Sequence, residues 1–203
     1  NFVGLVEICV RISSDLENTD FVYVKSDSGS CVLAYSGEMV VEPIYSAIKY
    51  LPANSTIYQK EKGLFILSQG RNKALWSIDS VIKTGLEYRS ITAYSKSVVK
   101  LDYGGGYYTL FNGKEFLEEP LLLLQNERLL INKGLAVAMR YNRYGLLRLK
   151  DFTFIVPPKY QGLKYHSDST YHSIQNGLYG LVDTMGKVLV PNIYERELKK
   201  VRI

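Results

Sequence analysis

Three features of the 203-residue sequence predict an all-β fold of about five antiparallel β-hairpin repeats, most simply a small β-propeller. Residues 144–160 and 179–194 repeat one pattern, in which a Tyr-Gly step and two apolar strands end in proline and tyrosine. Second strands begin near residues 30, 64, 107, 144 and 178, which gives a period of 34 to 43 residues. Tyrosine, present 17 times, suits pleated and half-buried surfaces. A period of this length indicates an array of small β units.

Five hairpins are expected, each with two alternating strands joined by a polar or glycine turn. They pair 21–25 with 31–35, 56–59 with 64–67, 97–101 with 107–111, 136–141 with 144–149, and 170–175 with 178–183. The fourth is expected to turn at Asn142-Arg143. The fifth is the best defined, because its Asn176-Gly177 turn suits the positive φ angles of a type I′ turn.

A third strand is expected to follow each hairpin, most clearly at 38–41, 114–117 and 187–190. A proline should then end the ladder because it has no N–H to donate. These prolines are Pro43, Pro120, Pro157 and Pro191, and the rings that follow are Tyr45, Tyr88, Tyr160 and Tyr194, with Leu124 in the matching position. Candidate fourth strands are 47–51, 90–94, 128–131, 162–165 and 198–203.

The repeats predict a single β-repeat domain over residues 1–203. Their approximate bounds are 8–45, 46–88, 89–124, 125–160 and 161–194, with 195–203 as a closing or next-repeat strand. Two architectures satisfy this arrangement: a closed propeller, sealed by pairing of 2–12 with 198–203, or an open array.

The segment 177–194, Gly-Leu-Tyr-Gly-Leu-Val-Asp-x-x-Gly-Lys-Val-Leu-Val-Pro-x-x-Tyr, resembles the bacterial WG repeat. That repeat joins a Trp-Gly step, an apolar strand, a Gly-Lys turn and a second apolar strand to a Pro-x-Tyr close. Residues 144–160 match it well, and 31–45 and 107–124 match it more weakly; Tyr144 and Tyr179 replace the tryptophan. The resemblance implies a bacterial interaction or ligand-display module, often secreted or envelope-associated, and brings no catalytic residues.

Composition excludes some classes of protein. No apolar run approaches the roughly 18 to 20 residues that a membrane span needs. Two cysteines, Cys9 and Cys31, form no disulfide framework, and are expected to be reduced core residues, with a Cys9–Cys31 bridge as the alternative. The net charge of +5 is spread along the chain and gives mild support for an acidic partner. Because the sequence starts at Asn1 without a signal-peptide pattern, we expect a piece cut from a longer precursor.

The Tyr-Gly steps are interpreted as packing sites. A glycine inside a strand indicates that another group approaches closely, and a ring of the neighbouring repeat is the expected visitor. The rings of Tyr45, Tyr160 and Tyr194 are expected to pack between repeats, with their hydroxyls at the rim. Positions that recur in every unit belong to the scaffold, so a functional site is expected where the repeats differ.

Two hairpin tips differ from the rest and supply the candidate ligand contacts. The tip at 102–108 is rich in glycine and tyrosine and includes Tyr107 and Tyr108. The tip at 140–144 interleaves Arg140 and Arg143 with Tyr141, a combination that can stack on bases or sugars. Plain solvated hairpin ends are the alternative interpretation of both.

Other chemistry-bearing residues do not combine into a site. His166-Ser167-Asp168 is no triad, because neighbouring strand residues point to opposite faces. His166 and His172 could meet across a loop as metal ligands, but no cysteine is nearby and no acidic residue stands at helical spacing, so a zinc site is not expected. Glu115 and Glu118-Glu119 form the one tight acidic cluster, where paired carboxylates can serve glycoside hydrolysis but a charged turn is the favoured interpretation.

We therefore expect a non-catalytic module that binds protein or glycan through hairpin tips, without metal or cofactor. A basic nucleic-acid or anionic-polymer binder is the first alternative, and an enzyme with its site in a propeller channel, such as a glycan hydrolase, is the second.

Overall fold

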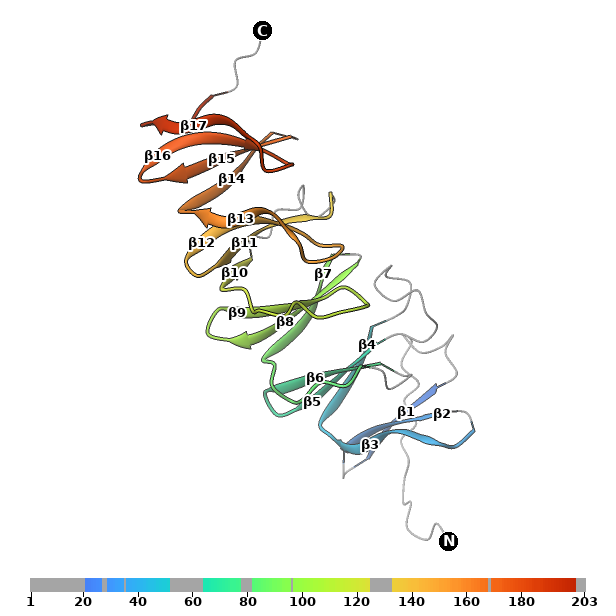
Figure 1. The fold of residues 1–203 in the computed structure, drawn as a ribbon. Coiled ribbons are helices and arrows are strands. Elements are labelled where there is room, and N and C mark those ends of the chain that lie inside the picture. The colour runs from blue at the N-terminus through green and yellow to red at the C-terminus, as the bar shows by residue number, and fades with distance from the viewer. Residues whose placement is uncertain are drawn as a thin grey trace. The chain divides into compact units, whose positions relative to one another are not determined.

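The structure, a computed structural model, confirms an all-β fold of hairpin repeats arranged as five antiparallel sheets that follow one another along the chain (Figure 1). It describes residues 21–26, 29–34, 36–51, 64–77, 82–95, 97–124, 133–167 and 169–199. In the part of the chain so described, no sheet closes on itself.

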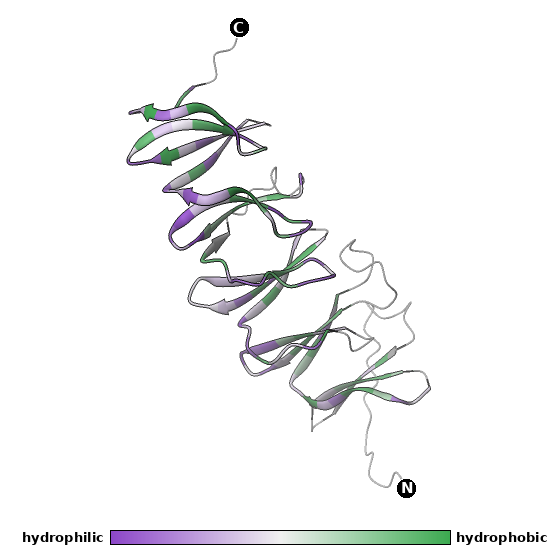
Figure 2. Cartoon of the chain, viewed as in Figure 1, coloured by the Kyte–Doolittle hydropathy of each residue, from purple (hydrophilic) through white to green (hydrophobic). Residues whose placement is uncertain are grey.

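Each sheet is built from strands that are consecutive in the sequence. The first three sheets are β1 (Phe21–Ser26), β2 (Gly29–Ala34) and β3 (Met39–Tyr45); β4 (Ala47–Leu51), β5 (Leu64–Gln69) and β6 (Asn72–Ser77); and β7 (Ser90–Ser95), β8 (Val98–Gly104) and β9 (Tyr107–Phe111). The fourth is β10 (Leu123–Leu124), β11 (Leu135–Arg140), β12 (Arg143–Arg148) and β13 (Phe154–Tyr160). The fifth is β14 (Gly162–Ser167), β15 (Thr170–Gln175), β16 (Leu178–Asp183) and β17 (Val188–Tyr194). Figure 2 shows hydrophobic residues along many of the strands and hydrophilic residues at several turns.

Contacts divide the chain into two units, Asn1–Lys96 with Leu101–Gly104, and Ser97–Lys100 with Gly105–Ile203. In each unit, apolar residues of successive sheets share a core. The core of the first unit joins Val32 and Val41 to Phe65. In the second unit, residues of β13 pack with residues of β14, β15 and β16; they are Val156, Tyr160, Leu163, Tyr171 and Val182. A sheet therefore buries its apolar residues partly against its neighbour.

Four of the five predicted hairpins form: β1 with β2, β8 with β9, β11 with β12, and β15 with β16. The second prediction was wrong. Residues 64–67 lie in β5, which pairs with β4 along one edge and β6 along the other, so neither edge is left for 56–59. Residues 56–59 themselves lie outside the described residues.

The segments 47–51, 90–94 and 162–165 are strands, as predicted, but each opens the next sheet. Residues 114–117 make only the isolated bridge of Phe111 with Phe116, and do not form a strand. Residues 2–12, 128–131 and 200–203 lie outside the described residues. The choice between a closed propeller and an open array therefore stays a prediction.

The prolines do not end their strands, contrary to the prediction. Pro43, Pro157 and Pro191 lie inside β3, β13 and β17, which continue to a tyrosine. On β12 and β13, Tyr144 faces Tyr160 while Leu146 faces Val156, so β13 carries extra residues and bulges. A bulge leaves backbone groups unpaired, which is where a strand accepts proline.

The glycine of each Tyr-Gly step lies against this bulge. A Cβ atom added to Gly180 would lie 2.6 Å from the carbonyl oxygen of Val190 and 2.9 Å from the nitrogen of Asn192. One added to Gly145 would meet the carbonyl oxygen of Val156. The close approach was predicted correctly but its source was not: backbone of the adjacent strand fills the space, rather than a ring of the next repeat.

The predicted packing of rings between repeats holds for Tyr160, which is 2% exposed within the core of the second unit. Tyr194 occupies the matching position on β17 and is 45% exposed. The difference arises because β14 and β15 supply Leu163 and Tyr171 against Tyr160.

Two further sequence expectations concern cysteine and membrane insertion. Cys31 is a buried free thiol, and burial raises its pKa; Cys9 lies outside the described residues. Among the residues that the structure describes, none form a helix long and apolar enough to cross a membrane.

Candidate binding groove at two hairpin tips

Three of the five candidate contact residues line one groove in the second unit. Tyr107 comes from the start of β9, whereas Arg140 and Tyr141 come from the β11–β12 tip. The groove has a volume of about 400 Å³, and its other lining residues are Glu119, Pro120, Leu122 and Asn142. Two tyrosines, a proline and a leucine make its lining largely apolar. The two tips that differ from the other repeats thus meet at one site.

The tip between β11 and β12 turns at Tyr141-Asn142, one residue before the predicted position. Both residues have positive φ, 49° and 58°, as a two-residue type I′ turn requires. The equivalent turn in the fifth sheet, Asn176-Gly177, has φ angles of 52° and 76°. A bulky residue with positive φ is unusual, and strain of this kind gathers at functional sites. Tyr141 therefore stands where the chain elsewhere uses the favoured asparagine.

Glu119 fixes the tyrosine and the arginine at this tip. Its Oε2 atom accepts a hydrogen bond from the Tyr141 hydroxyl at 3.1 Å and forms an ion pair with Nη1 of Arg140 at 3.2 Å. Nη2 of Arg140 also donates to the Glu119 carbonyl oxygen at 2.9 Å, and the guanidinium lies 5.2 Å from the centre of the Phe154 ring. The Tyr141 residue is 78% exposed, so its ring is held at the hydroxyl while most of its surface faces solvent.

The opposite wall is Tyr107, which is 52% exposed and follows the Gly105-Gly106 turn. Tyr108 is half-buried, and the amine of Lys100 lies 4.5 Å from the centre of its ring. Adjacent strand residues alternate between faces, which explains why Tyr107 lines the groove while Tyr108 does not. Arg143 is exposed at the start of β12 and is absent from the groove lining.

A second cavity, of about 240 Å³, adjoins the groove and shares Glu119 and Arg140 with it. Its lining is acidic, because Glu115 and Glu118 face it together with Asp151. Apolar parts come from Phe116, Leu117 and Phe152. The acidic cluster noted in the sequence is thus joined by a fourth carboxylate from the β12–β13 connection.

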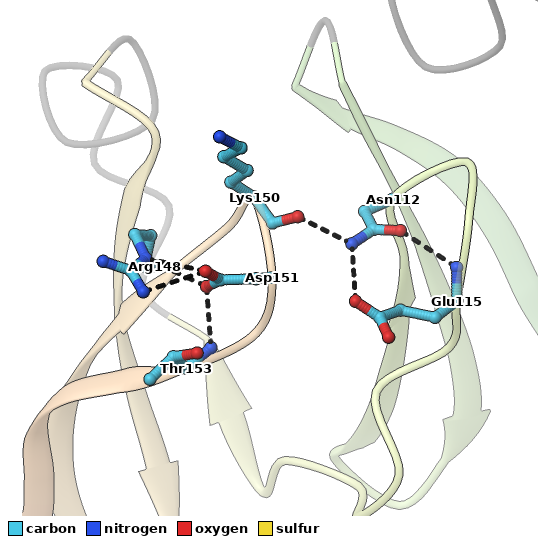
Figure 3. A network of polar contacts seen from close by, with 6 residues as sticks. All are labelled: Asn112, Glu115, Arg148, Lys150, Asp151 and Thr153. Carbon is cyan, nitrogen blue, oxygen red and sulfur yellow. Dashed lines mark hydrogen bonds and ion pairs between the residues drawn. The ribbon is translucent and has the colours of Figure 1, made fainter.

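Figure 3 shows the polar contacts around Glu115 and Asp151, two of the residues that line this cavity. Asn112 Nδ2 donates to the carbonyl oxygen of Lys150 at 2.9 Å, which ties the turn after β9 to the turn after β12. Asn112 Oδ1 also accepts from the Glu115 backbone nitrogen at 3.0 Å. Arg148, at the end of β12, pairs with Asp151 at 2.8 Å, and the hydrogen bond from Arg148 lowers the pKa of Asp151 to about 2. Asn112 therefore fixes the backbone of Glu115, and Arg148 fixes the side chain of Asp151.

Sequence reasoning did not identify Glu119, Pro120 and Leu122 as groove residues. Glu119 was interpreted as part of a charged turn, and Pro120 as the end of a ladder. The one available signal was that this repeat keeps the Gly turn and the proline but replaces the regular third strand with a Glu-rich stretch. That signal alone did not identify the groove, because Glu119 contacts Arg140 of the β11–β12 tip, which is 21 residues away along the chain.

The histidines form a separate contact in the fifth sheet. The rings of His166 and His172 lie edge to face with centres 4.3 Å apart. His172 is buried, and its Nδ1 atom has no hydrogen-bond partner. Burial lowers the pKa of His172, and the charge of His166 lowers it further. Across the described ranges, no group of three or more His, Cys, Asp or Glu residues is placed to hold a metal ion.

Comparisons with known proteins place the chain in no family. No protein-family model matches it, and no curated protein matches it. Among solved structures it is similar to BamB from Moraxella catarrhalis, at 11% sequence identity and a TM-score of 0.32. The match covers 85% of this chain and 58% of that one, so the chain spans less than two thirds of that protein's length.

Proposed function

We propose that this chain is a non-catalytic interaction module that binds protein or glycan in the groove between the two hairpin tips. The observation that carries the proposal is the meeting of Tyr107 with Arg140 and Tyr141 around one groove. These residues come from separate hairpins, and the tips of both hairpins depart from the repeat pattern. By contrast Tyr160, which stands at a recurring position, is used for packing.

The geometry suits binding because the contact surface is prepared in advance. Tyrosine offers a large amphipathic ring with few torsions to fix, so ordering it on binding costs little entropy. Glu119 already holds the Tyr141 hydroxyl, and the turn already holds its backbone. A surface that is fixed before binding loses less freedom when the ligand arrives.

Charge argues against the nucleic-acid alternative at this site. Arg140, one of the two arginines that suggested it, is paired with Glu119, and the adjoining cavity is acidic. A phosphate backbone would be repelled from such a lining. Binding that falls steeply with added salt, with anionic polymers as the preferred ligands, would instead support the alternative.

We also propose that the units are WG-type repeats in which tyrosine replaces tryptophan. In support, Tyr144 and Tyr179 directly precede the glycines beneath the bulges. Each lies opposite the closing tyrosine of its own repeat, with Tyr144 facing Tyr160 and Tyr179 facing Tyr194. The two ring positions of the motif are therefore cross-strand neighbours in both copies.

The test replaces the tip turn by the turn of the fifth sheet, Tyr141→Asn with Asn142→Gly. This change removes the ring and keeps the hairpin, because Asn-Gly is the favoured type I′ pair. Binding to arrays of immobilised peptides and glycans should fall at least tenfold, since truncated aromatic anchors dominate such interfaces. The melting temperature should not fall.

Tyr194→Ala is the matched control, because Tyr194 is also an exposed tyrosine of the second unit but lies outside the groove. It should keep full binding. Equal binding by the turn variant and the parent would refute the proposal, as would equal losses in the turn variant and the control.

A further inference from the structure

We propose that the groove binds an extended peptide segment of a partner protein, with an apolar side chain in the groove and a lysine or arginine in the adjoining acidic cavity. This inference rests on the proposed function and narrows it to one class of ligand. It is carried by the juxtaposition of the two cavities, which share Glu119 and Arg140 as a common wall.

The apolar half of the site is the groove itself. Pro120 and Leu122 line it together with the rings of Tyr107 and Tyr141. Its volume of about 400 Å³ accommodates a leucine, proline or aromatic side chain with part of its backbone. Extended segments suit a pair of adjoining pockets, because their side chains enter separate pockets while the backbone passes over the surface.

The negative charge of the second cavity favours a basic side chain in the ligand. Four carboxylates and Arg140 line it. Two of the carboxylates are compensated, Asp151 by Arg148 and Glu119 by Arg140. Neither Glu115 nor Glu118 takes part in an ion pair described by the structure, although Glu115 accepts a long hydrogen bond from Asn112. Among the residues that line the cavity, negative charge is therefore in excess, in a chain whose net charge is +5.

A cationic side chain makes use of this excess, whereas a neutral glycan does not and an anionic polymer is repelled by it. Charges at the rim of an interface mainly set the choice of partner and the rate of encounter. The common wall means that one ligand can enter both cavities within a short stretch. In an extended chain, which rises about 3.3 Å per residue, side chains two residues apart point the same way. We therefore expect the apolar and basic residues within three positions of each other.

The experiment uses the whole chain and fluorescein-labelled decapeptides of glycine and serine. Each probe carries one leucine, proline or tyrosine and one lysine or arginine, one to three positions apart. Matched peptides carry glutamate in place of the basic residue, and neutral oligosaccharides form a third set. Fluorescence polarisation at low and high salt should show preference for the basic peptides, weakened by salt.

Two variants separate the inference from the proposed function. The double variant Glu115→Gln with Glu118→Gln removes two negative charges at exposed positions. It should lower the affinity for basic peptides about fivefold, as expected for exposed ion pairs. It should leave peptides without a basic residue unchanged. Glu195→Gln, at another exposed position of the second unit, is the charge control and should change nothing.

The outcomes are distinct. If the Tyr141-Asn142 turn variant loses binding but the double glutamine variant keeps full affinity for basic peptides, the inference is overturned and the proposed function stands. Preference for neutral oligosaccharides or for glutamate peptides overturns the inference as well. Undiminished binding of basic peptides by the turn variant overturns both.

Discussion

Replacement of Gly180 by alanine tests the account of the repeat most directly. The φ angle of Gly180 does not fall in the left-handed region, so the backbone itself would accept alanine. The obstacle is space, because the new Cβ would lie 2.6 Å from the carbonyl oxygen of Val190 and 2.9 Å from the nitrogen of Asn192. Both are backbone atoms of the bulge in β17, so no side-chain rotation can relieve the contact.

The size of the effect follows from two opposing contributions. Forcing extra atoms into a filled site costs about 1–3 kcal/mol, and the upper part of that range applies where backbone must move. Alanine also stabilises by about 0.4–1 kcal/mol, because it restricts the unfolded chain. The net loss should be about 2 kcal/mol. For a chain of this size that lowers the melting temperature by about 4–8 °C, and Gly180→Val should lower it further.

Thermal unfolding followed by circular dichroism measures the loss, with two glycines as controls. In Gly162→Ala the Cβ would lie 2.9 Å from the Cδ1 atom of Ile174, the flexible end of a side chain, so a smaller loss is expected. In Gly85→Ala no atom lies within 4 Å, so stability should be unchanged or slightly raised. If Gly180→Ala melts at or above the parent, or if all three variants melt together, the bulge explanation is wrong.

Three further predictions concern charge and packing. Arg148 lowers the pKa of Asp151 from 3.8 to about 2, so the ionised Asp151 stabilises the fold fully above about pH 4, and this stabilisation is lost between about pH 4 and pH 2. Asp151→Asn should remove that part of an acid-unfolding curve, and an unchanged curve would contradict the prediction. Burial lowers the pKa of His172 below 6.5, and His166 lowers it further, so the fold favours neutral His172 and is destabilised as the pH falls below about 6.5. NMR titration should give His172 a pKa below 6.5, and His166→Asn should raise that pKa. Tyr160→Ala should cost about 3–5 kcal/mol in urea unfolding, as for other large buried side chains, and a loss under about 1 kcal/mol would show that the ring is not a core residue.

Local sequence signals predicted the parts of the fold that depend on neighbouring residues. Asn176-Gly177 specifies its turn through its own backbone preferences, and that hairpin forms as expected. Tyr141-Asn142 adopts the same turn without such a signal, so its position was predicted one residue late. Tyrosine is held there by the contact with Glu119, which is distant in the sequence.

Pairing between distant strands was harder to predict for the same reason. Residues 64–67 have an alternating pattern that any neighbouring strand could match, and only the folded chain shows that β4 and β6 occupy both edges of β5. The glycines indicated a close approach but could not indicate what approaches, because the bulge depends on register across two strands. The groove itself was not predicted: its two tips differ visibly from the repeat, but the sequence does not indicate that they meet, and Glu119 contacts Arg140 and Tyr141 only when they do.

In the second unit the core lies between successive sheets. The residues that stabilise the fold are therefore different from those exposed at the hairpin tips. Stability in such an arrangement is a sum of terms for each sheet and terms for each junction between neighbours. Tyr160 belongs to a junction, so a change there is felt on both sides of it. Tyr141 belongs to neither of the two core clusters described above, and it is 78% exposed. Under the proposed function, changes at positions 141 and 142 would therefore alter ligand preference while the sheets and their junctions remain the same.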